Sequence, residues 1–138
     1  MTPSEIRNTS SIPSLFARFV QERPEANFVF VPQGEHPDYS WSGIPRQEAL
    51  EQVAGLARRL QALGVREGSK VAIWSSTRVE WCWIDMALLS LGAVTVGIYP
   101  TLTKDVILEQ MADAEVEMLI VEDEEQYIQW EEDFDELE

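Results

Sequence analysis

The stretch KVAIWSSTRVEWCWIDMALLSLGAVTVGI, residues 70–98, decides the fold of this chain. It opens and closes with short, mainly apolar segments, residues 70–74 and 93–98, which are predicted to be strands. Residues 79–91 lie between them and are long and apolar enough for a helix, and Gly92 interrupts the pattern before the second strand. This order of strand, helix and strand predicts two parallel strands joined by a crossover helix.

The helix predicted in this stretch is apolar on every side, whereas a surface helix carries an apolar stripe of little more than about 100°. Its apolar residues are Val79, Trp81, Cys82, Trp83, Ile84, Met86, Ala87, Leu88, Leu89 and Leu91. So short a chain has too little surface to cover such a helix, so we expect further structure or a partner to cover it. The alternative is that the N-terminal part of the chain folds back over it. Burial of Trp81, Trp83, Met86 and Leu89 in a lone protomer would contradict our expectation.

The same alternation continues toward the carboxyl end of the chain. Residues 103–112 have the pattern of a helix, residues 117–121 that of a strand, and residues 124–137 that of a last helix. Two successive crossovers imply three parallel strands. We therefore predict an α/β fold with a three-stranded parallel β-α-β-α-β core.

Two pairs of residues have the spacing of a capping box, in which side chains bond the free amides of the first helical turn. Thr77 is followed by Glu80, and Asp123 is followed by Gln126. Both pairs predict the start of a helix.

An N-terminal helix and a loose β-hairpin are predicted before the core. Residues 13–23 form a short amphipathic helix, and residues 27–31 and 38–42 are β-prone and joined by a turn-rich segment. Residues 45–63 repeat apolar side chains at helical spacing, and Gly64 follows as a left-handed stop. The hairpin and the first helix are expected to form a peripheral layer on the α/β core.

The charge of the chain is strongly negative and unevenly spread. Ten Lys and Arg stand against 25 Asp and Glu, a formal charge of −15, which disfavours a nucleic-acid partner. Residues 122–138 hold ten of the acids and no Lys or Arg, and they are predicted to form an acidic C-terminal helix. We interpret residues 1–138 as a single α/β domain that is incomplete by itself.

The single Cys82 and the single His36 exclude an internal disulfide and a closed Cys/His zinc site, so no metal site is predicted. Their places, in an apolar helix and in a proline-flanked turn, also disfavour a nucleophile and base pair. Residues 1–9 lack the apolar core of a signal peptide, and charged residues interrupt the apolar stretch 79–99, so no transmembrane segment is expected. A reducing, cytoplasmic compartment fits best.

The turns that follow the first two parallel strands are the candidate ligand edge of the sheet. Residues 75–78 and 99–103 lie at carboxyl ends of strands, where open α/β sheets usually bind ligands. Arg78 offers a cation for a phosphate or a carboxylate. The alternative, which we favour, is that Thr77 and Thr103 only cap helices and that Arg78 only pairs with an acid. No P-loop motif or dinucleotide-binding glycine motif occurs.

Four segments together resemble the start of the adenylate-forming acyl-CoA synthetases, and most closely the long-chain fatty-acid CoA ligases. The resemblance covers residues 12–137, and the segments stand in family order and spacing. These segments are YSWS at 39–42, LGVREGSKVAI at 63–73, TRVEW at 77–81 and GAVTVGIYPTL at 92–102.

Such enzymes use ATP and Mg²⁺ to convert a fatty acid to an acyl-adenylate and then pass the acyl group to the thiol of coenzyme A. The resemblance implies that Tyr99, Pro100 and Thr101 border the coenzyme A nucleotide. It implies no catalytic residue in this chain, because the family's phosphate loop, adenine-binding motif and C-terminal lid do not occur in it.

The expected role is therefore the N-terminal part of such a ligase. Alone it is expected to be inactive and to bind no cofactor tightly, and its expected partner is the remainder of the ligase. The parent enzyme is expected in the cytoplasm, and its peripheral association with a membrane is compatible with this expectation. The alternative is a non-catalytic binding or oligomerisation module derived from the same fold, which associates with itself or with a ligase subunit.

Overall fold

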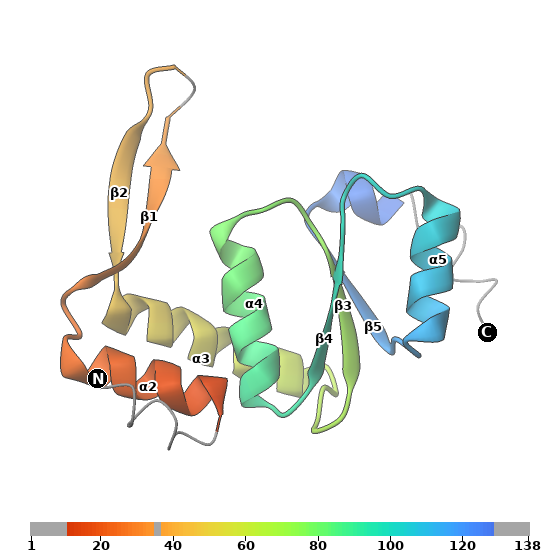
Figure 1. Ribbon diagram of the computed structural model, residues 1–138, viewed down its shortest axis with the longest axis horizontal. Coiled ribbons are helices and arrows are strands. Elements are labelled where there is room, and N and C mark those ends of the chain that lie inside the picture. The colour runs from red at the N-terminus through yellow and green to blue at the C-terminus, as the bar shows by residue number, and fades with distance from the viewer. Residues whose placement is uncertain (1–10, 35–36, 129–138) are drawn as a thin grey trace.

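The computed structural model describes residues 11–34 and 37–128 and confirms the predicted α/β class. The chain alternates helices and strands in the predicted order (Figure 1). The elements are α2 (Ile12–Glu22), β1 (Asn27–Gln33), β2 (Ser40–Pro45), α3 (Arg46–Ala62), β3 (Lys70–Trp74), α4 (Val79–Ser90), β4 (Val94–Ile98), α5 (Lys104–Asp113) and β5 (Met118–Val121). Residues 124–128 are helical. The rest of the predicted acidic helix lies outside the described residues.

The parallel sheet has three strands in the order β4-β3-β5. Trp74 at the end of β3 is level with Ile98 of β4 and with Val121 of β5, so the carboxyl ends of the strands form one edge. Helix α4 follows β3 on one side of the sheet, and α5 follows β4 on the other (Figure 1). Open α/β sheets usually bind ligands outside the carboxyl ends of their strands. The ends of β3 and β4 are neighbours at that edge.

Each face of the sheet has its own apolar core, which explains why the strands lack polar alternation. Val71 and Ile73 of β3 are fully buried in the core on the side of α2, α3 and α4. Ala72 and Trp74 lie in the smaller core with α5. The central strand is thus covered from both sides.

Helix α4 is only partly covered in this protomer. Trp83 is 6% exposed and contacts Phe28 of β1, with ring centroids 5.6 Å apart, so part of the N-terminal region does fold back over α4. Trp81, Met86 and Leu89 are half-buried. The complete shielding that would contradict the expected cover is therefore not found, and the covering partner stays a prediction.

The β1–β2 hairpin is antiparallel, as predicted, and its strands are longer than predicted. It projects away from the α/β body (Figure 1). Phe30 pairs with Gly43 and Pro32 with Trp41, and neither Phe30 nor Trp41 belongs to one of the two cores. Phe30 is 59% exposed and Trp41 is 60% exposed.

Two of the predicted helix boundaries are confirmed. Gly64 ends α3 with φ of +98°, the left-handed conformation that glycine tolerates best. The Gln126 backbone N–H donates to Asp123 Oδ1 at 2.8 Å, and Gln126 Oε1 accepts from the Glu122 N–H at 2.8 Å, one residue before the predicted position. Among residues 11–34 and 37–128, no helix has the length and apolarity needed to cross a bilayer.

The predicted capping box at Thr77 and Glu80 is wrong. The residue that caps α4 is Arg78, and no side-chain capping bond is present there. The Glu80 carboxylate bonds the Arg78 guanidinium at 2.9 Å, so it does not reach back to the Thr77 amide. Thr103 does precede α5 as its cap residue, but its hydroxyl makes no capping bond either.

Candidate ligand site at the carboxyl edge of the sheet

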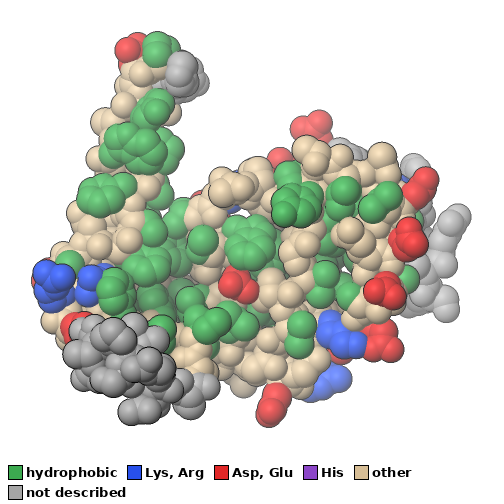
Figure 2. Space-filling view, viewed as in Figure 1, with side chains coloured by type: hydrophobic (Ala, Val, Ile, Leu, Met, Phe, Trp, Pro, Cys, Tyr) green, Lys and Arg blue, Asp and Glu red, His purple; other side chains and the backbone are tan. Residues whose placement is uncertain are grey.

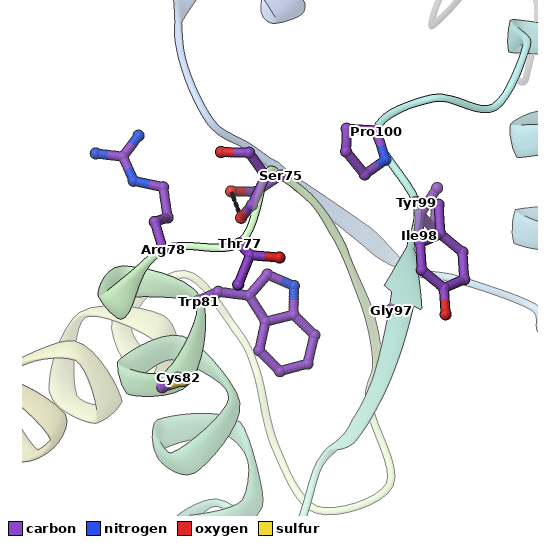
Figure 3. A pocket seen from close by; sticks show the side chains of 10 residues that line it. Ser75, Thr77, Arg78, Trp81, Cys82, Gly97, Ile98, Tyr99 and Pro100 are labelled. Atoms are coloured by element: carbon purple, nitrogen blue, oxygen red, sulfur yellow. Dashed lines mark hydrogen bonds between the residues drawn. The ribbon is translucent and has the colours of Figure 1, made fainter. Parts of the chain in front are cut away.

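A pocket of about 370 Å³ opens between the carboxyl ends of β3 and β4. Its volume falls within the range of roughly 300–1,000 Å³ that is usual for small-molecule sites. Figure 3 shows the side chains of its wall. The lining residues are Ser75, Ser76, Thr77, Arg78, Trp81, Cys82, Gly97, Ile98, Tyr99 and Pro100.

Three elements contribute to the wall, and a glycine of one faces a tryptophan of another. The turn after β3, the first turn of α4 and the end of β4 meet at the pocket. The Trp81 ring of α4 lies beside Gly97 of β4 (Figure 3), and a Cβ at Gly97 would come within 3.4 Å of Trp81 Cζ2. Gly97 and the Trp81 indole thus face each other in the wall of the pocket.

The structure brings together most of the residues that the sequence singled out. Tyr99 and Pro100 line the pocket, and so does the whole turn 75–78. Thr101 follows them in the chain but is not among the lining residues. Tyr99 is 75% exposed, so its ring stands at the open side of the site.

Arg78 pairs with acids, which is the alternative favoured from the sequence. Its Nε donates to Glu80 Oε2 at 2.9 Å, and its Nη1 donates to Glu122 Oε1 at 3.0 Å. The hydrogen bond and the charge of Glu80 are the main causes that raise the pKa of the guanidinium. Two carboxylates thus engage the cation of this turn.

Glu122 connects the end of β5 to the turn after β3. Its Oε2 accepts from the Ser76 backbone N–H at 2.8 Å and lies 3.4 Å from Ser75 Oγ, and its Oε1 accepts from Ser76 Oγ at 3.0 Å. The backbone hydrogen bond from Ser76 is the largest cause that lowers the pKa of Glu122, followed by the Ser76 hydroxyl. In the sequence, Glu122 stands out only as part of the acidic tail, and no pattern there predicts this contact.

Cys82 of α4 lines the pocket and is exposed to solvent. Desolvation, followed by the charge of Asp85, raises the pKa of its thiol, which disfavours a nucleophilic thiolate. His36, the base considered for it, lies outside the described residues. Within residues 11–34 and 37–128, no group of three or more His, Cys, Asp or Glu is placed to hold a metal ion.

Three further residues of the site, Trp81, Gly97 and Ile98, were not predicted from the sequence. One signal for them was available, because a glycine inside an apolar strand often marks a close approach of another group. Gly97 interrupts such a strand, and Trp81 fills the space beside it.

These features define an α/β protein with a pocket of small-molecule size at the carboxyl edge of its parallel sheet, the edge where such sheets usually bind ligands. The chain belongs to the AMP-binding enzyme family of adenylate-forming ligases, whose model matches residues 16–137. The family resemblance seen in the sequence is thereby confirmed.

The curated relatives are acid–CoA ligases. The chain is 36% identical over 106 residues to the long-chain-fatty-acid–CoA ligase FadD15 of Mycobacterium bovis, an alignment that spans 70% of this chain and 18% of that protein. It is 27% identical over 107 residues to fatty acyl-CoA synthetase A of Dictyostelium discoideum, spanning 75% of this chain and 16% of that protein. The chain therefore spans less than a fifth of the length of these relatives.

Solved structures of other proteins have a similar fold. The N-terminal subdomain of Klebsiella oxytoca NpsA, in complex with 3-hydroxyanthranilyl-AMSN, is similar with a TM-score of 0.71 and 27% identity over 83% of this chain and 27% of that one. An artificial fusion of NpsA with ThdA, also from Klebsiella oxytoca, gives a TM-score of 0.73 and 26% identity over 82% of this chain and 21% of that one.

Proposed function

We propose that this chain is the part of an ATP-dependent long-chain fatty-acid CoA ligase that borders the coenzyme A site. The observation that carries the proposal is the position of Tyr99 and Pro100 in the wall of the pocket between β3 and β4. The fatty-acid substrate is proposed from the relatives that are named as fatty-acyl-CoA ligases. In that parent enzyme, ATP and Mg²⁺ would form the acyl-adenylate, and coenzyme A would accept the acyl group. We place the parent ligase in the cytoplasm, because one exposed cysteine fits a reducing compartment.

The chemistry of the pocket favours a flat group of low charge, such as the purine ring of coenzyme A. Trp81, Ile98, Tyr99 and Pro100 supply aromatic and apolar wall. Arg78, the cation of the lining, already bonds Glu80 and Glu122. Aromatic faces stack on planar rings, whereas a phosphate requires free cations or amides.

A titration with acetyl-CoA, whose thiol is capped, tests the site. Fluorine NMR of the chain labelled with 5-fluorotryptophan resolves its five tryptophans, and Trp81→Phe assigns the resonance of Trp81. We expect millimolar acetyl-CoA to shift the Trp81 resonance, and Tyr99→Ala to weaken the apparent affinity at least threefold. Tyr127→Ala is the matched control, because Tyr127 is also exposed and does not line the pocket. A titration that leaves Trp81 unchanged at saturating acetyl-CoA would overturn the assignment.

We also propose that the chain alone does not form an acyl-adenylate. Nucleotidyl transfer needs preorganised cations and amides aimed at the phosphate. At the described pocket, Arg78 is held by carboxylates, and the described residues contain no cluster of three or more His, Cys, Asp or Glu placed to hold a metal ion. Hydroxylamine trapping with palmitate, ATP and Mg²⁺ should therefore give only the background rate. Hydroxamate formation above background would contradict this part of the proposal.

The second candidate function is a non-catalytic module that associates with itself or with a ligase subunit. The exposed aromatic side chains of the projecting hairpin favour it, because large apolar side chains in contact with water often mark an interface. Tyr39 and Trp41 stack there edge to face with centroids 5.5 Å apart. A discrete dimer in sedimentation at several concentrations would support this module, and ill-defined aggregates would not.

A further inference from the structure

We propose that Glu122 is a positioning residue of the pocket and that it holds the turn 75–78 in place from across the sheet. The inference rests on the proposed function only for the identity of the ligand. The contact itself concerns the shape of the pocket and is tested separately below.

The carboxylate of Glu122 meets three donor residues of that turn. It accepts from the Ser76 backbone N–H and hydroxyl at 2.8 and 3.0 Å, and it lies 3.4 Å from the Ser75 hydroxyl. Arg78 Nη1 donates to it at 3.0 Å. Hydrogen bonds to a charged acceptor are about twice as strong as neutral ones. The side chain is 21% exposed, so water competes only partly for these donors.

The direction of this contact matters for the pocket. β5 and β4 lie on opposite sides of β3, so Glu122 holds the turn from the side opposite Tyr99 and Pro100. Figure 3 shows Arg78 pointing away from those two residues. The cation is therefore drawn toward β5, and the β4 side of the pocket keeps its apolar wall.

A second, smaller cavity marks the side to which the charge is drawn. It measures about 120 Å³, and Arg78, Glu80 and Glu122 line it together with Ile120 and apolar residues of β3 and α4. Three residues, Ser75, Arg78 and Trp81, line both cavities. If Glu122 no longer held the turn 75–78, the wall that the two cavities share would change, and Trp81 in that wall would change its position.

The test compares Glu122→Gln with the matched control Glu124→Gln. Each replacement removes one negative charge, and the two positions are only two residues apart. Glu124 is exposed and lines neither cavity. The glutamine keeps the size of Glu122 but lacks the negative charge that holds Arg78. We expect Glu122→Gln to shift or broaden the fluorine resonance of Trp81 and to leave that of Trp41 on the hairpin unchanged. The Ser76 amide should exchange at least tenfold faster with solvent, while the amides of β3 keep their rates.

A role in stability alone would predict a different result. It would speed exchange in β3 and at Ser76 by the same factor and leave the native Trp81 resonance in place, which would overturn the proposal. If Glu122→Gln fails to fold, Ser76→Ala removes one donor and keeps the carboxylate, and a smaller displacement of the Trp81 resonance is expected. An unchanged Trp81 resonance in that variant would likewise overturn the proposal.

The acetyl-CoA titration separates this inference from the proposed function. If both hold, Glu122→Gln raises the apparent dissociation constant at least threefold, and Glu124→Gln does not. A displaced Trp81 resonance without acetyl-CoA binding in any variant supports the positioning role and overturns the ligand assignment. Acetyl-CoA binding with equal affinity in both variants, with Trp81 unmoved, overturns the positioning role alone.

Discussion

At the scale of single residues, the hydroxyl of Thr95 is buried in β4 and has no hydrogen-bond partner among the described residues. An unpaired buried polar group costs about 1–3 kcal/mol. Thr95→Val keeps the branched shape and removes that group, so we expect the free energy of unfolding to rise by about 1 kcal/mol. Urea unfolding measures the change. The exposed Thr77→Val serves as control and should stay within about 0.5 kcal/mol of the parent. A loss of stability in Thr95→Val would mean that the hydroxyl has a partner.

The acids of the turn network make a second prediction, which concerns pH. Hydrogen bonds lower the pKa of Glu122 below its ordinary value of 4.5, with the Ser76 amide as the main cause. A carboxyl whose pKa is lower in the folded state stabilises the fold fully above the unfolded value and loses this effect as the pH falls through the folded value. The urea midpoint of Glu122→Gln should therefore lie below that of Glu124→Gln at pH 7, and the difference should shrink as the pH falls below 4.5. A difference that does not change with pH would contradict this interpretation.

At the scale of elements, Phe28 joins the hairpin to the helices. Its ring centroid lies 5.3 Å from that of Phe16 and 5.6 Å from that of Trp83, so one side chain links β1, α2 and α4. Because Phe28 is half-buried, Phe28→Ala should lower the free energy of unfolding by about 2–3 kcal/mol, below the usual cost of a core phenylalanine. Phe30→Ala on the same strand is the control and should cost less than about 0.5 kcal/mol, since Phe30 is 59% exposed. Equal losses in urea unfolding would show that the hairpin is held elsewhere.

The elements could be predicted because their signals are local. The residues of α4 and β4 are separated by Gly92, whose φ of +72° fits the break read from the sequence. Gly64 ends α3 for the same physical reason, since a side chain is strained at such angles. Parallel pairing followed from the order of helix and strand, because a crossover helix returns the chain to the same edge of the sheet.

The candidate site could be predicted only in part. The turns at the strand ends were identified from the order of the elements, and residues of both turns, Tyr99 and Pro100 among them, line one pocket. The contact between Glu122 and Ser76 spans 46 residues, and it depends on β5 pairing beside β3. No local pattern encodes that pairing, so the acidic tail gave no reason to single out Glu122.

At the scale of the whole molecule, the exposed apolar surface and the negative charge have opposite effects on self-association. Figure 2 shows hydrophobic side chains along the projecting hairpin and acidic side chains toward the α5 side. Phe30, Trp41 and Tyr99 are between 59% and 75% exposed, which favours association. The formal charge of −15 opposes association by mutual repulsion. The balance between the two should therefore depend on salt.

Salt screens this repulsion, with a Debye length of about 10 Å at 0.1 M that falls to about 3 Å at 1 M, and it leaves apolar contacts in place. We therefore expect the sedimenting mass of the chain at fixed concentration to rise between low salt and 0.5 M NaCl. The double variant Phe30→Ser with Trp41→Ser should remove that rise, because it takes away the exposed rings of the hairpin and leaves the charge unchanged. The exposed Tyr127→Ser, at the other end of the described chain, is the control and should associate like the parent. A mass that falls as salt is added would mean that ion pairs, and not the hairpin, hold the copies together.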